Sequence, residues 1–422
     1  MIPVSKRLRY GPRIFKGFAL LVALGVLAMV ALLVSLRLEH RIAVTLPTPT
    51  GPLAVGRAIY DWTDDRSLEM LAPVPGTKRE LLVWIWYPAD PRQSSVIDDY
   101  LPSFARVAIE RDLPALIGKF LTRDLAKVRG HSLRDSDISP RERTYPVVIM
   151  RAGASAEVAN YSTLAEDLAS QGYVVVGFDA PYRTNVVAFP DGRVITRRPE
   201  NNPELCAEKT GEERARCAER ILRAWTGDTA FVLDRLQQWN ASGSGRFSGR
   251  LDLSHVGVFG HSFGGAMAAE FCHEDARCKA GIDIDGAPFG SVIQTGIDRP
   301  FMFLMSDHGH ESDPEAGKIM ANIQSIYLHL PADTRLLATI RGANHFLFSD
   351  DGALLKSHIV LRVLRIFGIV GIDGRRQLAI TTYCVHGFFD AHLRDSHSQF
   401  VIPSPLYPEI RVTGVGGGIN AR

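Results

Sequence analysis

From residue 145 onward, short apolar runs alternate with longer stretches in which apolar residues recur every three or four positions. The short runs are typical of buried strands, and the longer spacing is typical of amphipathic helices. This alternation predicts the α/β fold class, with a mostly parallel central sheet and helices on both faces. The predicted strands cover 147–150, 174–178, 256–259, 280–285, 300–305 and 335–340, and the predicted helices 161–170, 220–239, 316–328, 354–367 and 375–393.

Before residue 145 the pattern is less regular. Two strands are predicted, at 53–60 and 80–87, and the second reads ELLVWIWY, which is rich in β-prone residues. Residues 98–128 have helical spacing that is interrupted at Pro114, because proline cannot continue a helix. The ordinary role of such an apolar stripe is core packing, and the alternative is a cover for a pocket or a contact with a bilayer.

The N-terminus contains an uncharged run from Gly17 to Leu36, long enough as a helix to cross a hydrocarbon core of about 30 Å. Lysines and arginines are more numerous before this run than after it, which predicts a single-pass anchor in the inner (cytoplasmic) membrane with the N-terminus in the cytoplasm. A cleaved signal peptide is the alternative, but its apolar core is usually shorter and no small-residue cleavage site follows Leu36. A buried core helix is the third interpretation.

These features predict the domain organisation. Residues 1–16 form a basic cytoplasmic segment, 17–36 the transmembrane helix, 37–52 a linker rich in Thr and Pro, and 53–422 a periplasmic or extracellular catalytic domain. The 422 residues carry a net charge of only +2, without a basic patch interleaved with aromatic residues, so nucleic acid is not an expected partner.

The five cysteines fit an exported location. Cys206 and Cys217 lie close together in a polar insertion, and Cys272 and Cys278 flank another short polar turn, so two local disulfides are predicted. Zinc binding is the rival explanation, but the CxxC spacing is absent, and free thiols stay open as an alternative. Cys384 is expected to be an unpaired core residue. No metal site and no cofactor are predicted.

The stretch VGVFGHSFGGAMAAE at 256–270 is the strongest chemical signal in the chain. A β-branched run leads into a Gly-x-Ser-x-Gly turn, and a helix pattern of small residues follows. This is the nucleophile elbow, in which a strained strand-to-helix turn exposes a serine hydroxyl. Ser262 is the predicted nucleophile, and Gly260 and Gly264 are required because side chains there would collide with the neighbouring elements.

A serine nucleophile of this kind needs an acid and a base later in the chain. The strand AGIDID ends at Asp285, which is the leading acid, and Asp283 on the same strand is the second candidate. His345 follows the strand 335–340 in a loop and is the predicted base. His261 is expected to pack beside the nucleophile. Two further histidines, His308 and His310, are expected to be solvated.

The oxyanion of an acyl-transfer intermediate requires two backbone N–H donors. Phe263, the residue after the nucleophile, should supply one of them. The second should come from the loop after the strand that ends at Met150, in which Gly153 permits the turn and Ala154 is the candidate donor.

Several blocks carry a resemblance to a known family. They read, in chain order, GPLAVG, VWIWYPA, DLASQGYVVVGFD, HVGVFGHSFGGA, CKAGIDIDGAPFG, IRGANHF and IDGRRQLAI, and together they extend over 51–412. In these blocks the chain resembles the plasma-type (isoform II) platelet-activating factor acetylhydrolases and their bacterial relatives in the α/β-hydrolase superfamily.

The resemblance implies a Ser262–Asp285–His345 triad, with Ala154 and Phe263 as oxyanion donors. The family's His-Gly pair in the oxyanion loop reads Ala152-Gly153 here. The implied activity is calcium-independent hydrolysis of short or oxidised acyl esters of phospholipids, so the implied partners are a lipid or small ester and the membrane. The alternatives are a broad carboxylesterase or polyester hydrolase on the same scaffold, and a hydrolase fold that serves only as a binding module.

Overall fold

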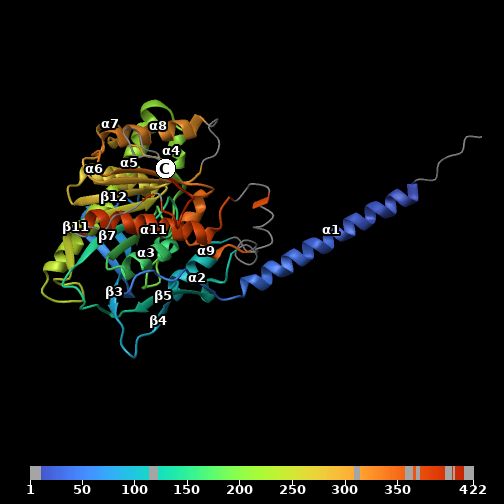
Figure 1. Ribbon diagram of the computed structural model, residues 1–422, viewed down its shortest axis with the longest axis horizontal. Coiled ribbons are helices and arrows are strands. Elements are labelled where there is room, and N and C mark those ends of the chain that lie inside the picture. The colour runs from blue at the N-terminus through green and yellow to red at the C-terminus, as the bar shows by residue number, and fades with distance from the viewer. Residues whose placement is uncertain are drawn as a thin grey trace, which may run out of the picture.

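The structure is a computed structural model that describes residues 11–113, 122–307, 314–356, 365–366, 371–394, 402 and 404–412. A long helix, α1 (Gly11–His40), extends away from a body in which helices surround one large sheet (Figure 1). The side chains of α1 from Phe15 onward are largely exposed, and the helix is long and apolar enough to cross a membrane. A signal sequence has the same properties.

The central sheet has the strand order β1-β5-β2-β3-β8-β7-β11-β12-β13-β14-β15. Strands β8 to β14 in that order are parallel. Strand β3 pairs antiparallel with both β2 and β8, and β15 pairs antiparallel with β14, whereas β2 pairs parallel with β5. The predicted α/β class with a mostly parallel sheet is confirmed. The strands are β1 (Val44–Thr45), β2 (Ala54–Leu68), β3 (Lys78–Asp90), β4 (Ile97–Asp99), β5 (Val128–Arg134), β6 (Asp137–Ile138), β7 (Tyr145–Arg151), β8 (Val174–Asp179), β9 (Val186–Ala188), β10 (Val194–Thr196), β11 (Leu251–His261), β12 (Cys278–Ile284), β13 (Phe301–Met305), β14 (Arg335–Ile340) and β15 (Ile410–Val412).

Helices cover both faces of this sheet, and successive residues of β7 show the two layers. Val147 and Ile149 pack in the core beneath α5, α6 and α8, whereas Val148 and Met150 pack in the core beneath α3 and α11. Because side chains alternate along a strand, a continuous apolar run buries both faces. The helices are α2 (Ser103–Asp112), α3 (Ser162–Ser170), α4 (Glu204–Ala207), α5 (Gly211–Ala241), α6 (Phe263–Glu274), α7 (Val292–Thr295), α8 (Pro314–His329), α9 (Asp351–Leu354) and α11 (Gly374–Leu393).

The segment 98–128 differs from its sequence-based prediction. Helix α2 accounts for part of it, but β4 precedes that helix and β5 begins at Val128. Pro114, where the helix was predicted to break, lies outside the described residues, as does most of the helix predicted at 354–367.

Part of the segment between α1 and β2 is attached to the body. Strand β1 pairs with β5, and Leu46 is buried. The backbone N–H of Thr50 donates to Asp167 over 2.7 Å. These contacts fix the start of the sheet close to the C-terminal end of α1.

Candidate active site

Ser262 lies on the turn between β11 and α6, with φ 55° and ψ −125°. A positive φ is uncommon for a residue with a side chain and marks a strained position. The turn is possible because a Cβ at Gly260 would collide with the backbone of Gly264, and a Cβ at Gly264 would collide with the carbonyl of Ala152. The Ser262 N–H donates to the carbonyl of Ile284 over 2.8 Å, which ties the elbow to the adjacent strand β12.

Asp285 follows β12, and its carboxylate is buried. One carboxylate oxygen, Oδ2, lies 2.8 Å from Nδ1 of His345. Ser306 donates its backbone N–H to Oδ1 and its hydroxyl to Oδ2, each over 2.7 Å. Because Nδ1 faces the carboxylate, Nε2 is the nitrogen of His345 that can accept a proton. The contact with Asp285 orients the imidazole ring.

Asp283 has a different environment. Its Oδ1 accepts the Gly286 N–H over 2.8 Å, and its Oδ2 is buried without a hydrogen-bond partner. Burial raises the pKa of this carboxyl well above its usual value. Asp283 therefore supports the loop after β12 through Gly286 and is separate from the Asp285–His345 pair.

His261 is buried beside the nucleophile. Its Nδ1 lies 2.8 Å from the hydroxyl of Tyr161, and its ring centroid lies 4.6 Å from that of His345. Burial and, secondarily, the charge of His345 lower the pKa of His261 to about 3, so its ring is neutral under ordinary conditions. His261 packs next to the site as predicted. His308 and His310 lie outside the described residues.

The two candidate oxyanion donors lie at the same cavity. Phe263 begins α6, where the first N–H groups have no acceptor within the helix. Ala154 lies in the loop after β7, and the preceding residue Gly153 donates its N–H to the Tyr161 hydroxyl over 3.2 Å. Ser155, on the other side, has φ 69° and completes the turn. The loop is therefore held around Ala154.

A cavity of about 420 Å³ brings the five predicted site residues together. Among the described residues, the Ser262 hydroxyl makes no hydrogen bond with His345; in free enzymes this contact is often long and tightens when substrate binds. Apolar side chains form much of the wall, and charged groups accompany them. Its other lining residues include Pro203, Glu204, Cys206, Arg214, Ala218, Phe289, Lys318, Ile319 and Asn322.

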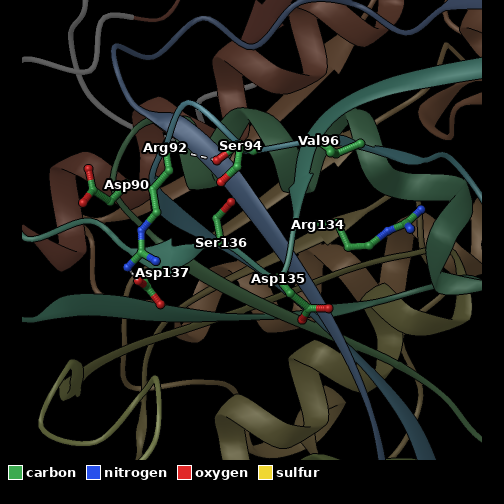
Figure 2. Close-up of a pocket in the computed structure, with 9 residues that line it drawn as sticks. Asp90, Arg92, Ser94, Val96, Arg134, Asp135, Ser136 and Asp137 are labelled. Carbon is green, nitrogen blue, oxygen red and sulfur yellow. Dashed lines mark hydrogen bonds and ion pairs between the residues drawn. The ribbon is translucent and has the colours of Figure 1, made fainter.

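Figure 2 shows another pocket, of about 350 Å³, at the turns that follow β3 and β5. Polar and charged side chains line most of it, and Arg92 forms an ion pair with Asp137 across it. None of the five predicted site residues contributes to this pocket. Over the described ranges, no group of three or more His, Cys, Asp or Glu side chains is arranged to hold a metal ion.

Both predicted disulfides are present. Cys206 pairs with Cys217 and Cys272 with Cys278, while Cys384 is buried and unpaired. The structure therefore has disulfides at these four cysteines, where free thiols and zinc binding were the alternatives.

Two contributors to the site were not found from the sequence. Ser306 fixes the Asp285 carboxylate, and its position directly after a predicted strand was the available signal. Tyr161 joins the loop after β7 to His261, but nothing in its local sequence indicates this contact.

Known proteins are similar to most of the chain. The family description "Platelet-activating factor acetylhydrolase, isoform II" matches residues 40–189 and 212–402, leaving 190–211 unmatched. A protein of Arthroderma benhamiae named "Probable 1-alkyl-2-acetylglycerophosphocholine esterase" is 26% identical over 86% of this chain and 92% of its own length. The platelet-activating factor acetylhydrolase of Cavia porcellus is 26% identical over 72% of this chain and 69% of its own.

A solved ferulic acid esterase from Streptomyces cinnamoneus has a similar structure. It has a TM-score of 0.69 and 27% identity, covering 88% of this chain and 100% of that one. The fold, the relatives and the family match agree on one class of enzyme, the carboxylic ester hydrolases. The chain belongs to the platelet-activating factor acetylhydrolase, isoform II, family.

Proposed function

We propose that the protein hydrolyses carboxylic esters through a covalent acyl-enzyme on Ser262, with His345 as base and Asp285 as the group that orients it. His345 takes the serine proton as Oγ attacks the ester carbonyl, and then gives that proton to the leaving alcohol. A water molecule, activated by the same histidine, hydrolyses the acyl-enzyme. The observation that carries the proposal is the 2.8 Å contact between His345 Nδ1 and Asp285 Oδ2, at the cavity that Ser262 lines.

The N–H groups of Ala154 and Phe263 would stabilise the oxyanion that forms in each half of the reaction. Loss of one such donor typically lowers kcat by about 10²–10³-fold. Both residues line the cavity beside Ser262, which supports this role.

The substrates that we propose are short-chain or oxidised acyl esters of phospholipids. The names of the relatives in Arthroderma benhamiae and Cavia porcellus support this class. Apolar groups such as Phe289 suit an acyl chain, and the cations Arg214 and Lys318, which also line the cavity, suit a phosphate. Because the solved neighbour is a ferulic acid esterase, a broad carboxylesterase is the second candidate.

We also propose that residues 17–36 anchor the enzyme in the inner membrane, with 1–16 in the cytoplasm and the catalytic domain of 53–422 on the outer side. The excess of positive charge before the span supports this orientation. The two disulfides support it as well, because disulfides persist in oxidising compartments. An anchor would keep the site close to lipid substrates.

The test compares the wild type with Ser262→Ala on p-nitrophenyl acetate. Only the wild type should hydrolyse it, and a variant of equal activity would refute the proposed nucleophile. A second assay compares phosphatidylcholines with a short or a long sn-2 acyl chain and a simple feruloyl ester. Preference for the short-chain phospholipid supports the first candidate, whereas preference for the feruloyl ester favours the second.

A further inference from the structure

One wall of the active-site cavity comes from a segment that the family match leaves out. Residues 190–211 lie between the two matched ranges and contain β10 and α4. Within this segment Pro203, Glu204 and Cys206 line the cavity that holds Ser262. The wall is therefore a feature of this chain that the common family pattern does not account for.

A covalent bond holds this wall in place. Helix α4 has only four residues, and so short a helix has little stability of its own. Cys206 in α4 is bonded to Cys217 in α5. On the other side, the Asn201 side chain donates to the carbonyls of Leu71 and Tyr182 over 2.9 and 3.1 Å. Between these two attachments, Pro203 and Glu204 are held at the cavity.

Helix α8 lines the same cavity as this segment. Lys318, Ile319 and Asn322 of α8 line the cavity together with the residues of α4 and with Arg214 and Ala218 of α5. Figure 1 shows α4, α5 and α8 gathered at the same end of the body. The width between α4 and α8 thus depends on where the disulfide holds α4.

We propose that the segment 203–206, held by the Cys206–Cys217 disulfide, is the selectivity wall that restricts the site to esters with short acyl groups. This inference rests on the proposed ester hydrolysis and deepens it. With the disulfide intact, long acyl chains meet the wall; without it, α4 moves and longer chains enter. One methylene group in an apolar pocket changes the specificity constant by roughly 10–200-fold, so a displaced wall has a measurable effect.

The matched control is the second disulfide. Cys272 and Cys278 join the end of α6 to the start of β12, and neither residue lines the cavity. The experiment measures kcat/KM for p-nitrophenyl octanoate and for p-nitrophenyl acetate and divides the first value by the second, which gives the octanoate-to-acetate ratio. Three full-length proteins are compared: the wild type, Cys206→Ala/Cys217→Ala and Cys272→Ala/Cys278→Ala. The ratio should rise at least about ten-fold in the first variant and keep the wild-type value in the second.

A second pair of variants decides the matter if removal of a disulfide prevents folding. Glu204 and Glu208 are both exposed on or next to α4, but only Glu204 lines the cavity. Glu204→Trp should narrow the site and lower the octanoate-to-acetate ratio, whereas Glu208→Trp should leave it unchanged.

The outcomes separate the two levels of the proposal. Wild-type esterase activity with the same ratio in all variants, or equal shifts in target and control variants, overturns the selectivity wall alone. A wild type that hydrolyses neither ester overturns the proposed function and the wall together.

Discussion

Asp283 and Asp285 show how two carboxyl groups on one strand end acquire different roles. Asp285 is surrounded by donors from Ser306 and by His345, so its charge is compensated. Asp283 receives one N–H, from Gly286, and has an oxygen without a partner. An uncompensated buried carboxyl favours its neutral form. Asp285, and not Asp283, therefore has the contacts that suit a partner of the histidine.

The corresponding prediction concerns turnover. Asp285→Asn should lower kcat by roughly 10⁴-fold, because an amide in this position favours the wrong histidine tautomer. Asp283→Asn should retain most of the activity, since its oxygen can still accept the Gly286 N–H. Steady-state hydrolysis of p-nitrophenyl acetate measures both. A larger loss in Asp283→Asn would assign the acid to residue 283.

The difference in stability between the wild type and Asp283→Asn should depend on pH, because only the wild type has the titrating carboxyl. The folded pKa of Asp283 lies above its usual 3.8, so between these two values the unfolded chain releases a proton that the folded chain keeps. The contribution of this carboxyl to stability is full below about pH 4 and declines as the pH rises toward the folded pKa. Thermal denaturation should therefore show the Tm of Asp283→Asn improving relative to wild type from pH 4 to 8. A constant difference would mean that the carboxyl is charged in the folded state.

At the scale of elements, the elbow is the turn at which the end of β11 packs closely against the start of α6. Gly260 and Gly264 allow β11 and α6 to approach, and the strained Ser262 lies between them. Phe263, the first residue of α6, lines the same cavity as Ser262, so the proposed nucleophile and one proposed oxyanion donor are neighbours on this turn.

A pair of glycine variants tests this packing. Gly264→Ala should lower the free energy of unfolding by about 1–3 kcal/mol, because its Cβ meets the carbonyl of Ala152. Gly317→Ala, in the exposed part of α8 with no atom within 4 Å of the added Cβ, should raise it by about 0.5–1 kcal/mol. Urea denaturation gives both values. Equal effects of the two substitutions would contradict the close packing of the elbow.

The elements predicted correctly from the sequence are those with strong local signals. The parallel strands β7, β8, β11 and β13 each contain a short apolar run, and α11 has clear helical spacing. Strand β5 reads VRGHSLR and was missed, because its polar and glycine residues give little β signal and its pairing partners lie far along the chain.

The residues of the candidate site also divide into those with a local sequence signal and those without one. Ser262 could be identified from its own turn, and Asp285 and His345 from their places after predicted strands. Ser306 and α4 could not, since their relation to the serine depends on which strands are neighbours and on a disulfide.

At the scale of the whole molecule, the apolar helix α1 and the body are joined by a segment that makes several contacts with the body. His40 at the end of α1 lies 2.9 Å from the carbonyl of Thr122, and Leu46 is buried. Thr50 donates to Asp167 through both its N–H and its hydroxyl. The described part of the connection therefore contributes to the stability of the body.

Truncation tests this contribution. A chain that begins at Arg37 should be more stable than one that begins at Gly51, because burial of Leu46 alone contributes about 1.5–3 kcal/mol. Both chains should hydrolyse p-nitrophenyl acetate, since neither lacks a residue of the site. Differential scanning calorimetry gives the two Tm values. Identical values would show that residues 37–50 add nothing to the fold.

The most direct measurement is covalent labelling of the folded, full-length protein by a fluorophosphonate, followed by peptide mass spectrometry. The label should appear on Ser262 with one equivalent per chain, in step with the loss of p-nitrophenyl acetate hydrolysis, and His345→Ala should abolish rapid labelling. Full loss of activity with the label on another residue, or rapid labelling that does not need His345, would contradict the account.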